Sequence, residues 1–118
     1  MSIRIEDAMG VHMRALGLHM QRSEILAANL ANEDTPGFQA RDLDFASEMR
    51  RQGEAPRFGE RSHAQLMYRV PSQPSQDGNT VELSVEQAAF SKSTSDFQTS
   101  LTFLNMKFRG LKQAIEGR

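Results

Sequence analysis

The chain has 118 residues, a formal net charge of −1 and a hydrophobic fraction of 38%. This length fits one ordinary domain and is too short for two, and a charge so close to zero gives no global field toward nucleic acid or an anionic membrane. Because the chain has no cysteine, disulfides, thiolate nucleophiles and cysteine-based zinc sites are excluded.

The sequence also speaks against two routes to a membrane. No apolar run approaches the roughly 20 residues that a membrane span needs. The first 17 residues, MSIRIEDAMGVHMRALG, carry charges where a cleaved signal peptide has an uninterrupted apolar region. We therefore expect a cytoplasmic protein, or one that is exported without a cleaved signal.

A long amphipathic helix is predicted from about residue 6 to about residue 32. Its main apolar stripe advances by steps of four and three, with Ser23 in the one polar slot, and comprises Met9, Met13, Leu16, Met20, Ala27 and Leu30. A second stripe repeats every seven residues beside it and comprises Val11, Leu18 and Ile25. Together they form a face wider than a two-stranded seam requires, which predicts contact with more than one neighbour.

The segment ANLANEDTPGF at 28–38 ends this helix. Asn32 can close the last turn, and Pro36 forces Thr35 out of the α region. Gly37 then allows a sharp change of direction. Phe38 follows as a candidate anchor that holds the turn against an apolar surface.

The middle of the chain, 39–82, is predicted to be mostly irregular. Residues 43–46 can form one or two turns of helix, whereas 50–62 are mostly charged and polar and predict a flexible excursion. QLMYRV at 65–70 is the one plausible strand, and the prolines that follow confine it to a short edge piece. Asp77 and Gly78 predict a turn.

A second long helix is predicted near the end of the chain, from about residue 84 to about residue 116. Ser84 and Gln87 have the spacing of a capping box. The apolar seam then steps by four and three without a break through Phe90, Thr94, Phe97, Leu101, Leu104, Phe108, Leu111 and Ile115. Serine and threonine are frequent in this segment and have mediocre helix propensity. The helix must therefore be stabilised by burial of its seam against the first helix and against neighbouring subunits.

Catalytic and metal-binding patterns are weak. His12 and His19 are seven residues apart with no third ligand on their face, so partly buried or interfacial histidines are the default interpretation. Neighbouring acidic residues at 33–34 and at 42 and 44 lack a nucleophile or a histidine nearby, and they read as turn and capping groups. The sequence has no GxSxG or SxxK setting and no phosphate-binding loop. We expect no enzyme activity, cofactor, metal, small-molecule substrate or nucleic-acid partner, although nothing in the sequence excludes an enzyme outright.

Two segments carry a family resemblance. ANLANEDTPGFQARD at 28–42 resembles the signature of the axial proteins of the bacterial flagellum, which form its rod, hook and hook-associated parts; the matching residues are Ala28, Asn29, Ala31, Asn32, Thr35, Pro36, Gly37 and Phe38. YRVPSQPSQDGNTVEL at 68–83 is similar to the segment that precedes the C-terminal helix in a proximal rod protein. The connection between the helices is short, which favours a small proximal rod protein over the hook and distal rod proteins.

The resemblance implies an all-α fold in which the long N- and C-terminal helices pair as a coiled coil. A mostly irregular middle segment, with at most a short strand or hairpin, joins them. The chain is then a single axial-protein unit over 1–118, with its first helix at about 6–32, the turn and connection at about 33–83, and its second helix at about 84–116. Such subunits pack around a central channel after leaving the cytosol unfolded through the flagellar type III export apparatus.

The implied function is that of a structural subunit of the basal-body rod. It joins the membrane ring and export gate to the rest of the drive shaft and transmits torque for motility. The implied partners are copies of itself, other flagellar rod proteins, and the membrane-ring, export-gate and rod-adaptor proteins, and the implied location is the periplasmic rod.

Two groups of residues are expected to carry this function. Subunit packing is assigned to Met9, Met13, Leu16, Met20, Leu30, Phe90, Phe97, Leu101, Leu104, Phe108, Leu111 and Ile115. The signature turn is assigned to Asn29, Asn32, Thr35, Pro36, Gly37 and Phe38. The alternatives are another small rod component or, from a different class, a helical export chaperone or adaptor that binds a partner helix in a groove.

Overall fold

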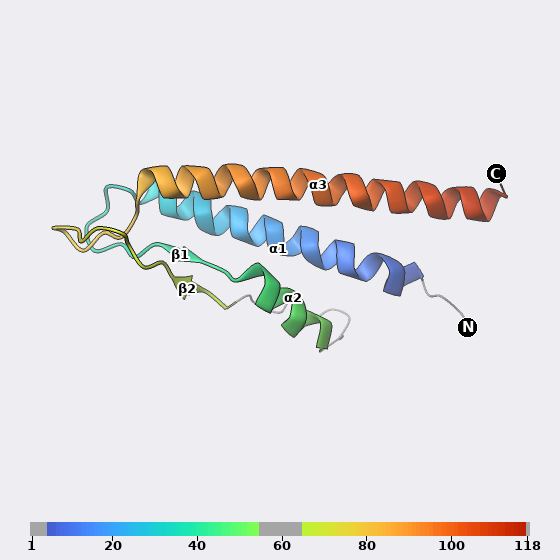
Figure 1. Cartoon of the computed structure of the whole chain (residues 1–118), viewed down its shortest axis with the longest axis horizontal. Coiled ribbons are helices and arrows are strands. Elements are labelled where there is room, and N and C mark those ends of the chain that lie inside the picture. The colour runs from blue at the N-terminus through green and yellow to red at the C-terminus, as the bar shows by residue number, and fades with distance from the viewer. Residues whose placement is uncertain (1–4, 55–64, 118) are drawn as a thin grey trace.

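Two long helices dominate the computed structural model, which describes residues 5–54 and 65–117 (Figure 1). Helix α1 spans Ile5–Ala31 and helix α3 spans Leu83–Glu116, so that α3 is about 50 Å long at about 1.5 Å per residue. The helices lie side by side and antiparallel, and the chain measures 64 × 27 × 19 Å. The predicted all-α fold with long paired helices is confirmed.

A short connector lies along the other side of α1 (Figure 1). It contains strand β1 (Arg41–Asp42), helix α2 (Phe45–Glu54) and strand β2 (Met67–Tyr68). The strands pair antiparallel, with Arg41 opposite Tyr68 and Asp42 opposite Met67. The prediction of at most a short strand or hairpin is therefore confirmed, and Tyr68 lies in the segment predicted as the strand.

Helix α2 is longer than the one or two turns predicted around residues 43–46. It continues through residues 50–54, which were expected to be irregular, while 55–62 of that predicted excursion lie outside the described residues. Local side chains explain the extension. Asp44 accepts hydrogen bonds from the backbone N–H and the hydroxyl of Ser47, which lowers the pKa of Asp44, and Arg51 pairs with Glu48 at 2.6 Å one turn apart.

The predicted capping box at the start of α3 is wrong. The helix begins at Leu83, its N-cap residue is Glu82, and no side chain caps it; Ser84 therefore lies inside the first turn. The carboxylate of Glu82 instead accepts hydrogen bonds from the N–H and the hydroxyl of Ser72, both at 2.6 Å, and these lower the pKa of Glu82. At the other end Gly117 closes the helix in the left-handed conformation, with φ of 70°, as expected for a C-terminal glycine.

The apolar core is small and lies mostly along α1, which is sandwiched between α3 and the connector. The buried apolar residues are Met9, Leu18, Leu26, Ala40, Leu43 and Leu104. Buried polar residues accompany them, among them Asn29, Glu86 and Ser93. The helix pair is thus held by polar contacts near the connector and by Met9 and Leu104 toward the open end. Within the described residues, no helix combines the length and apolarity that crossing a bilayer requires.

Candidate assembly interface

The signature turn after α1 has the backbone geometry that its sequence predicts. Gly37 has φ of 75°, a left-handed conformation that glycine adopts without strain. The N–H of Asn32 still bonds to the carbonyl of Ala28, so the turn follows directly on the helix. Pro36 is exposed and Phe38 is half-buried.

A second segment of the chain, 77–80, holds this turn in place. The side-chain amide of Asn79 donates to the carbonyls of Asn32 at 3.0 Å, Glu33 at 2.7 Å and Thr35 at 2.8 Å. The N–H of Gly37 donates to the carbonyl of Asp77 at 2.9 Å. Asn79 is buried and ties together three carbonyls of the turn that follows α1.

The signature residue Asn29 joins α1 to both the connector and α3. Its side-chain oxygen accepts from the N–H of Arg41 at 3.1 Å, and its amide nitrogen donates to the carbonyl of Arg41 at 2.6 Å. The same nitrogen donates to Glu86 Oε2 at 2.9 Å. The side chain of Asn29 therefore binds both backbone polar groups of Arg41, as a neighbouring strand would. Its two amide hydrogens and one of the two acceptor sites of its oxygen are used.

Partly buried charges extend this junction into an ionic network. Arg22 binds Asp42 through two parallel hydrogen bonds of 3.0 and 3.2 Å, and Arg69 donates to the second oxygen of Asp42 at 3.0 Å. Arg69 Nε also lies 2.7 Å from Oε1 of Glu86, close enough for an ion pair although not aligned as a hydrogen bond. Glu86 is fully buried, so its carboxylate needs Arg69 and Asn29 as partners.

The predicted seam of α3 divides into two rows in the structure. The row that faces α1 is buried or half-buried and comprises Phe90, Phe97, Leu104 and Leu111. The other predicted row is exposed and comprises Thr94, Leu101, Phe108 and Ile115. Its place against α1 is taken by a more polar row, Glu86, Ser93 and Ser100, and Ser93 is hydrogen-bonded to Ser23 of α1 at 3.0 Å.

Helix α1 divides in the same way. Its inward row comprises Met9, Leu16, Ser23 and Leu30, all buried or half-buried, whereas Met13, Met20 and Ala27 are exposed. The neighbouring inward positions are His12, His19 and Leu26 instead. We call the exposed positions the outward rows: Met13, Met20 and Ala27 on α1, and Thr94, Leu101, Phe108 and Ile115 on α3.

The outward rows leave large apolar side chains in solvent in a single chain. Met13 is 61% exposed, Phe108 52% and Ile115 76%. Such surfaces on a soluble protein mark sites of protein–protein contact. The predicted packing residues therefore fall into two sets, one that lies between the two helices of the chain and one that is exposed in the single chain.

The predictions about titratable side chains can also be placed. His19 is buried and stacks on Phe45, with ring centroids 4.3 Å apart and an angle of 15°. Burial lowers the pKa of His19, with Asp96 opposing and Arg22 reinforcing that shift. His12 is half-buried. Among residues 5–54 and 65–117, no three His, Asp or Glu side chains gather as a metal site would require.

Sequence reasoning missed the partners that organise the signature turn. Glu86, Asn79 and Arg69 were given no role, although Arg69 and Asn79 lie within the second resemblance segment, at 68–83, and Asp42 was expected only as a turn or capping group. The contacts that these residues make across the junction join positions 17 to 57 residues apart in the sequence, so no local periodicity marks them. The fully buried Leu26 was missed because it falls between the two predicted stripes.

The family profile and the relatives that match this chain all belong to the flagellar basal body rod proteins. The profile of the family described as "Flagella basal body rod protein" matches residues 9–39, which contain most of α1 and the signature turn. The flagellar basal body rod protein FlgB of Cereibacter sphaeroides is 43% identical over 94% of this chain and 95% of its own length. The FlgB proteins of Salmonella typhimurium and Proteus mirabilis are 39% and 37% identical, over 97% and 96% of this chain and 96% of each relative.

Proposed function

This chain belongs to the family of flagellar basal body rod proteins named FlgB, and from that premise we propose how its structure serves the rod. It is a structural subunit of the proximal rod of the bacterial flagellar basal body. We propose that it joins the membrane ring and export gate to the rest of the drive shaft, and that it transmits torque through dense helix packing.

The observation that carries this mechanism is the pair of outward rows. Each long helix buries one row within the chain and exposes a second, apolar row along much of its length. A polymer of such chains covers the second row with helices of neighbouring subunits, as the broad apolar face of α1 predicts. A structure that must transmit torque benefits because interfaces packed like protein interiors deform little.

The partners, location and lack of enzyme activity follow from the same premise. We propose contacts with copies of this chain, with other rod proteins and with the ring, export-gate and adaptor proteins, and no catalytic role. We also propose that the subunit passes through the flagellar type III export apparatus and works in the periplasmic part of the rod without cleavage of a signal peptide. The whole chain then acts as a single axial unit, with the signature turn as its fixed corner.

The first experiment asks whether the chain is part of the rod. A strain that lacks the gene should be non-motile, and the complementing protein should be recovered in purified basal bodies at the mass of the uncleaved 13.2 kDa chain. A subunit found only in the cytosol as a compact soluble dimer would instead indicate a chaperone or adaptor. A chain of lower mass in the rod would refute export without cleavage.

The second experiment tests the outward rows. Phe108→Asp places a charge on the outward row of α3 and should keep the subunit out of basal bodies, because an unpaired charge is costly inside an interface. Phe108→Leu preserves the apolar bulk and should restore both incorporation and swimming. Normal incorporation of Phe108→Asp would refute the assignment of this row to subunit packing.

A further inference from the structure

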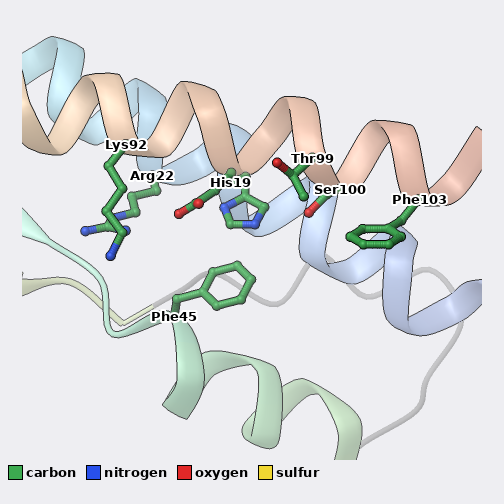
Figure 2. A pocket seen from close by; sticks show the side chains of 8 residues that line it. His19, Arg22, Phe45, Lys92, Thr99, Ser100 and Phe103 are labelled. Carbon is green, nitrogen blue, oxygen red and sulfur yellow. The ribbon is translucent and has the colours of Figure 1, made fainter.

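A pocket of about 370 Å³ opens between all three helices. Figure 2 shows His19 in its middle, Phe45 from the start of α2 below, and Phe103 of α3 at one end, while Arg22 and Lys92 lie at the other end. The hydroxyls of Thr99 and Ser100 and the carboxylate of Asp96 line the wall that α3 provides. The pocket therefore has an apolar end and a polar end, and it is large enough for a bulky side chain.

The pocket is lined by a histidine, His19, whose ring nitrogens lack hydrogen-bond partners among the described residues. His19 is 6% exposed, and neither of its ring nitrogens has a hydrogen-bond partner among the described residues. Nδ1 is completely enclosed, whereas Nε2 is not, so Nε2 is the atom that a molecule in the pocket can reach. Burial lowers the pKa of His19, so the ring is neutral at neutral pH. Nε2 then needs a hydrogen-bond acceptor if it carries the proton and a hydrogen-bond donor if it does not.

Tyr68 on β2 has the chemistry that this pocket requires. It is the single tyrosine of the chain and is 62% exposed, and the Arg41 guanidinium lies over its ring, 5.4 Å from the centroid. A phenol combines an apolar ring with a hydroxyl that both donates and accepts. The other large exposed hydrophobic residues, such as Met67 and Phe108, bring no comparable polar tip.

The backbone around Tyr68 is also open to a partner. Arg69 N–H bonds to the carbonyl of Ala40, and both polar backbone groups of Arg41 are bound to Asn29 instead of β2. In an antiparallel pair this places Arg41 and Tyr68 at a non-hydrogen-bonded position. The N–H and C=O of Tyr68 consequently point away from β1, at the outer edge of the sheet, where strands commonly add a partner.

We infer that Tyr68 of one subunit inserts into the His19 pocket of a second copy of this chain. The ring lies between Phe45 and Phe103, the hydroxyl meets His19 Nε2, and the hydroxyls of Thr99 and Ser100 face the open strand edge. Tyr68 does not line the pocket itself, so the contact joins two different parts of the chain and can be repeated head to tail from one copy to the next. This inference rests on the proposed function, because only a polymer brings many copies together.

The test replaces Tyr68 with the photoreactive residue p-benzoylphenylalanine in a motile strain. Illuminated basal bodies should yield a cross-linked species of two copies. Its tryptic digest should join position 68 to the peptide 15–22, which contains His19, to 93–107, which contains the α3 wall of the pocket, or to 42–50, which contains Phe45. The same photoreactive residue at Gln73, exposed in the following loop, is the matched control and should not label these peptides.

Each outcome decides the inference. Labelling of other peptides, or of another flagellar protein alone, overturns it, and so does labelling within one chain. If the photoreactive residue keeps the subunit out of the rod, a Tyr68→Cys, Ser100→Cys double variant of this cysteine-free chain is used instead. Oxidation of the double variant should give disulfide-linked multimers that neither single variant forms. Absence of these multimers overturns the contact. Absence of the wild-type chain from basal bodies would instead refute the proposed function.

Discussion

Gly37→Val is the most direct test of the signature turn. Gly37 has φ of 75°, where a β-branched residue costs about 1–3 kcal/mol. A Cβ at this position would meet no atom within 4 Å, so the Cβ itself causes no collision and this cost is one of backbone conformation. At about 1.4 kcal/mol for each factor of ten, the turn should form about 5 to 150 times less favourably.

The assay must separate two stages that the signature could serve. Export of the variant is scored in the periplasm of a strain that cannot build rods, and incorporation is scored in purified basal bodies. If the turn is structural, Gly37→Val is exported but poorly incorporated. If the motif is an export tag read in the unfolded chain, the variant stays in the cytosol.

Two matched variants sharpen the result. Gly37→Asn should be milder than Gly37→Val because asparagine tolerates the left-handed region better than other residues with a Cβ. Phe38→Leu should also be milder, because it keeps most of the apolar bulk and leaves the backbone free. Full incorporation of Gly37→Val, or equal defects in all three variants, would refute the argument that backbone conformation is what this motif supplies.

Three further predictions follow from burial and charge. Leu104→Asp places a carboxylate between the helices and should abolish swimming while export persists. Thr102→Asp, exposed on the same helix, should be tolerated. Normal swimming of Leu104→Asp cells would contradict the burial of Leu104 between the helices. Amide exchange on the isolated subunit should show little protection over 90–115, because a helix of weak propensity lacks its neighbours there, and strong protection in a proven monomer would contradict this. Burial lowers the pKa of His19 below 6.5 in the folded chain, so the unfolded chain binds a proton first as pH falls, and the free energy of unfolding decreases as pH drops through about 6.5 toward the folded pKa. The free energy of unfolding should therefore be lower at about pH 5.5 than at about pH 7.5, and an undiminished difference in His19→Gln would contradict this.

Much of the fold could be predicted because its main signals are local. The helices are long and strongly periodic, and their observed bounds lie within one residue of the predicted ones. The turn glycines at 37 and 78 both have positive φ, as the surrounding turn residues indicated. The errors lie at helix ends, where a single side chain decides: Asp44 supports a longer α2, and Glu82 binds Ser72 and leaves the capping box unformed.

The division into inward and outward rows could not be read from the sequence. Both rows of each helix are similarly apolar, so hydrophobicity gives no preference between them. The choice is made by polar pairs that the chain brings together from far apart, such as Ser23 with Ser93 and Asn29 with Glu86. Hydrophobic patterning placed the candidate packing residues on the two long helices, but it did not divide them into an inward and an outward set.

The polar pairs explain why the remaining apolar surface can be used for assembly. A purely apolar seam between two helices permits sliding by a turn or a heptad at little cost, whereas a buried polar group specifies one register. Displacing α3 by one heptad would separate Glu86 from Asn29 and Arg69 and leave its charge unpaired. The register within a chain is thus fixed at the connector end by polar groups, and the outward rows occupy defined heights along the helix pair. The proposed packing of neighbouring subunits requires this, because every copy must present the same apolar residues at the same positions.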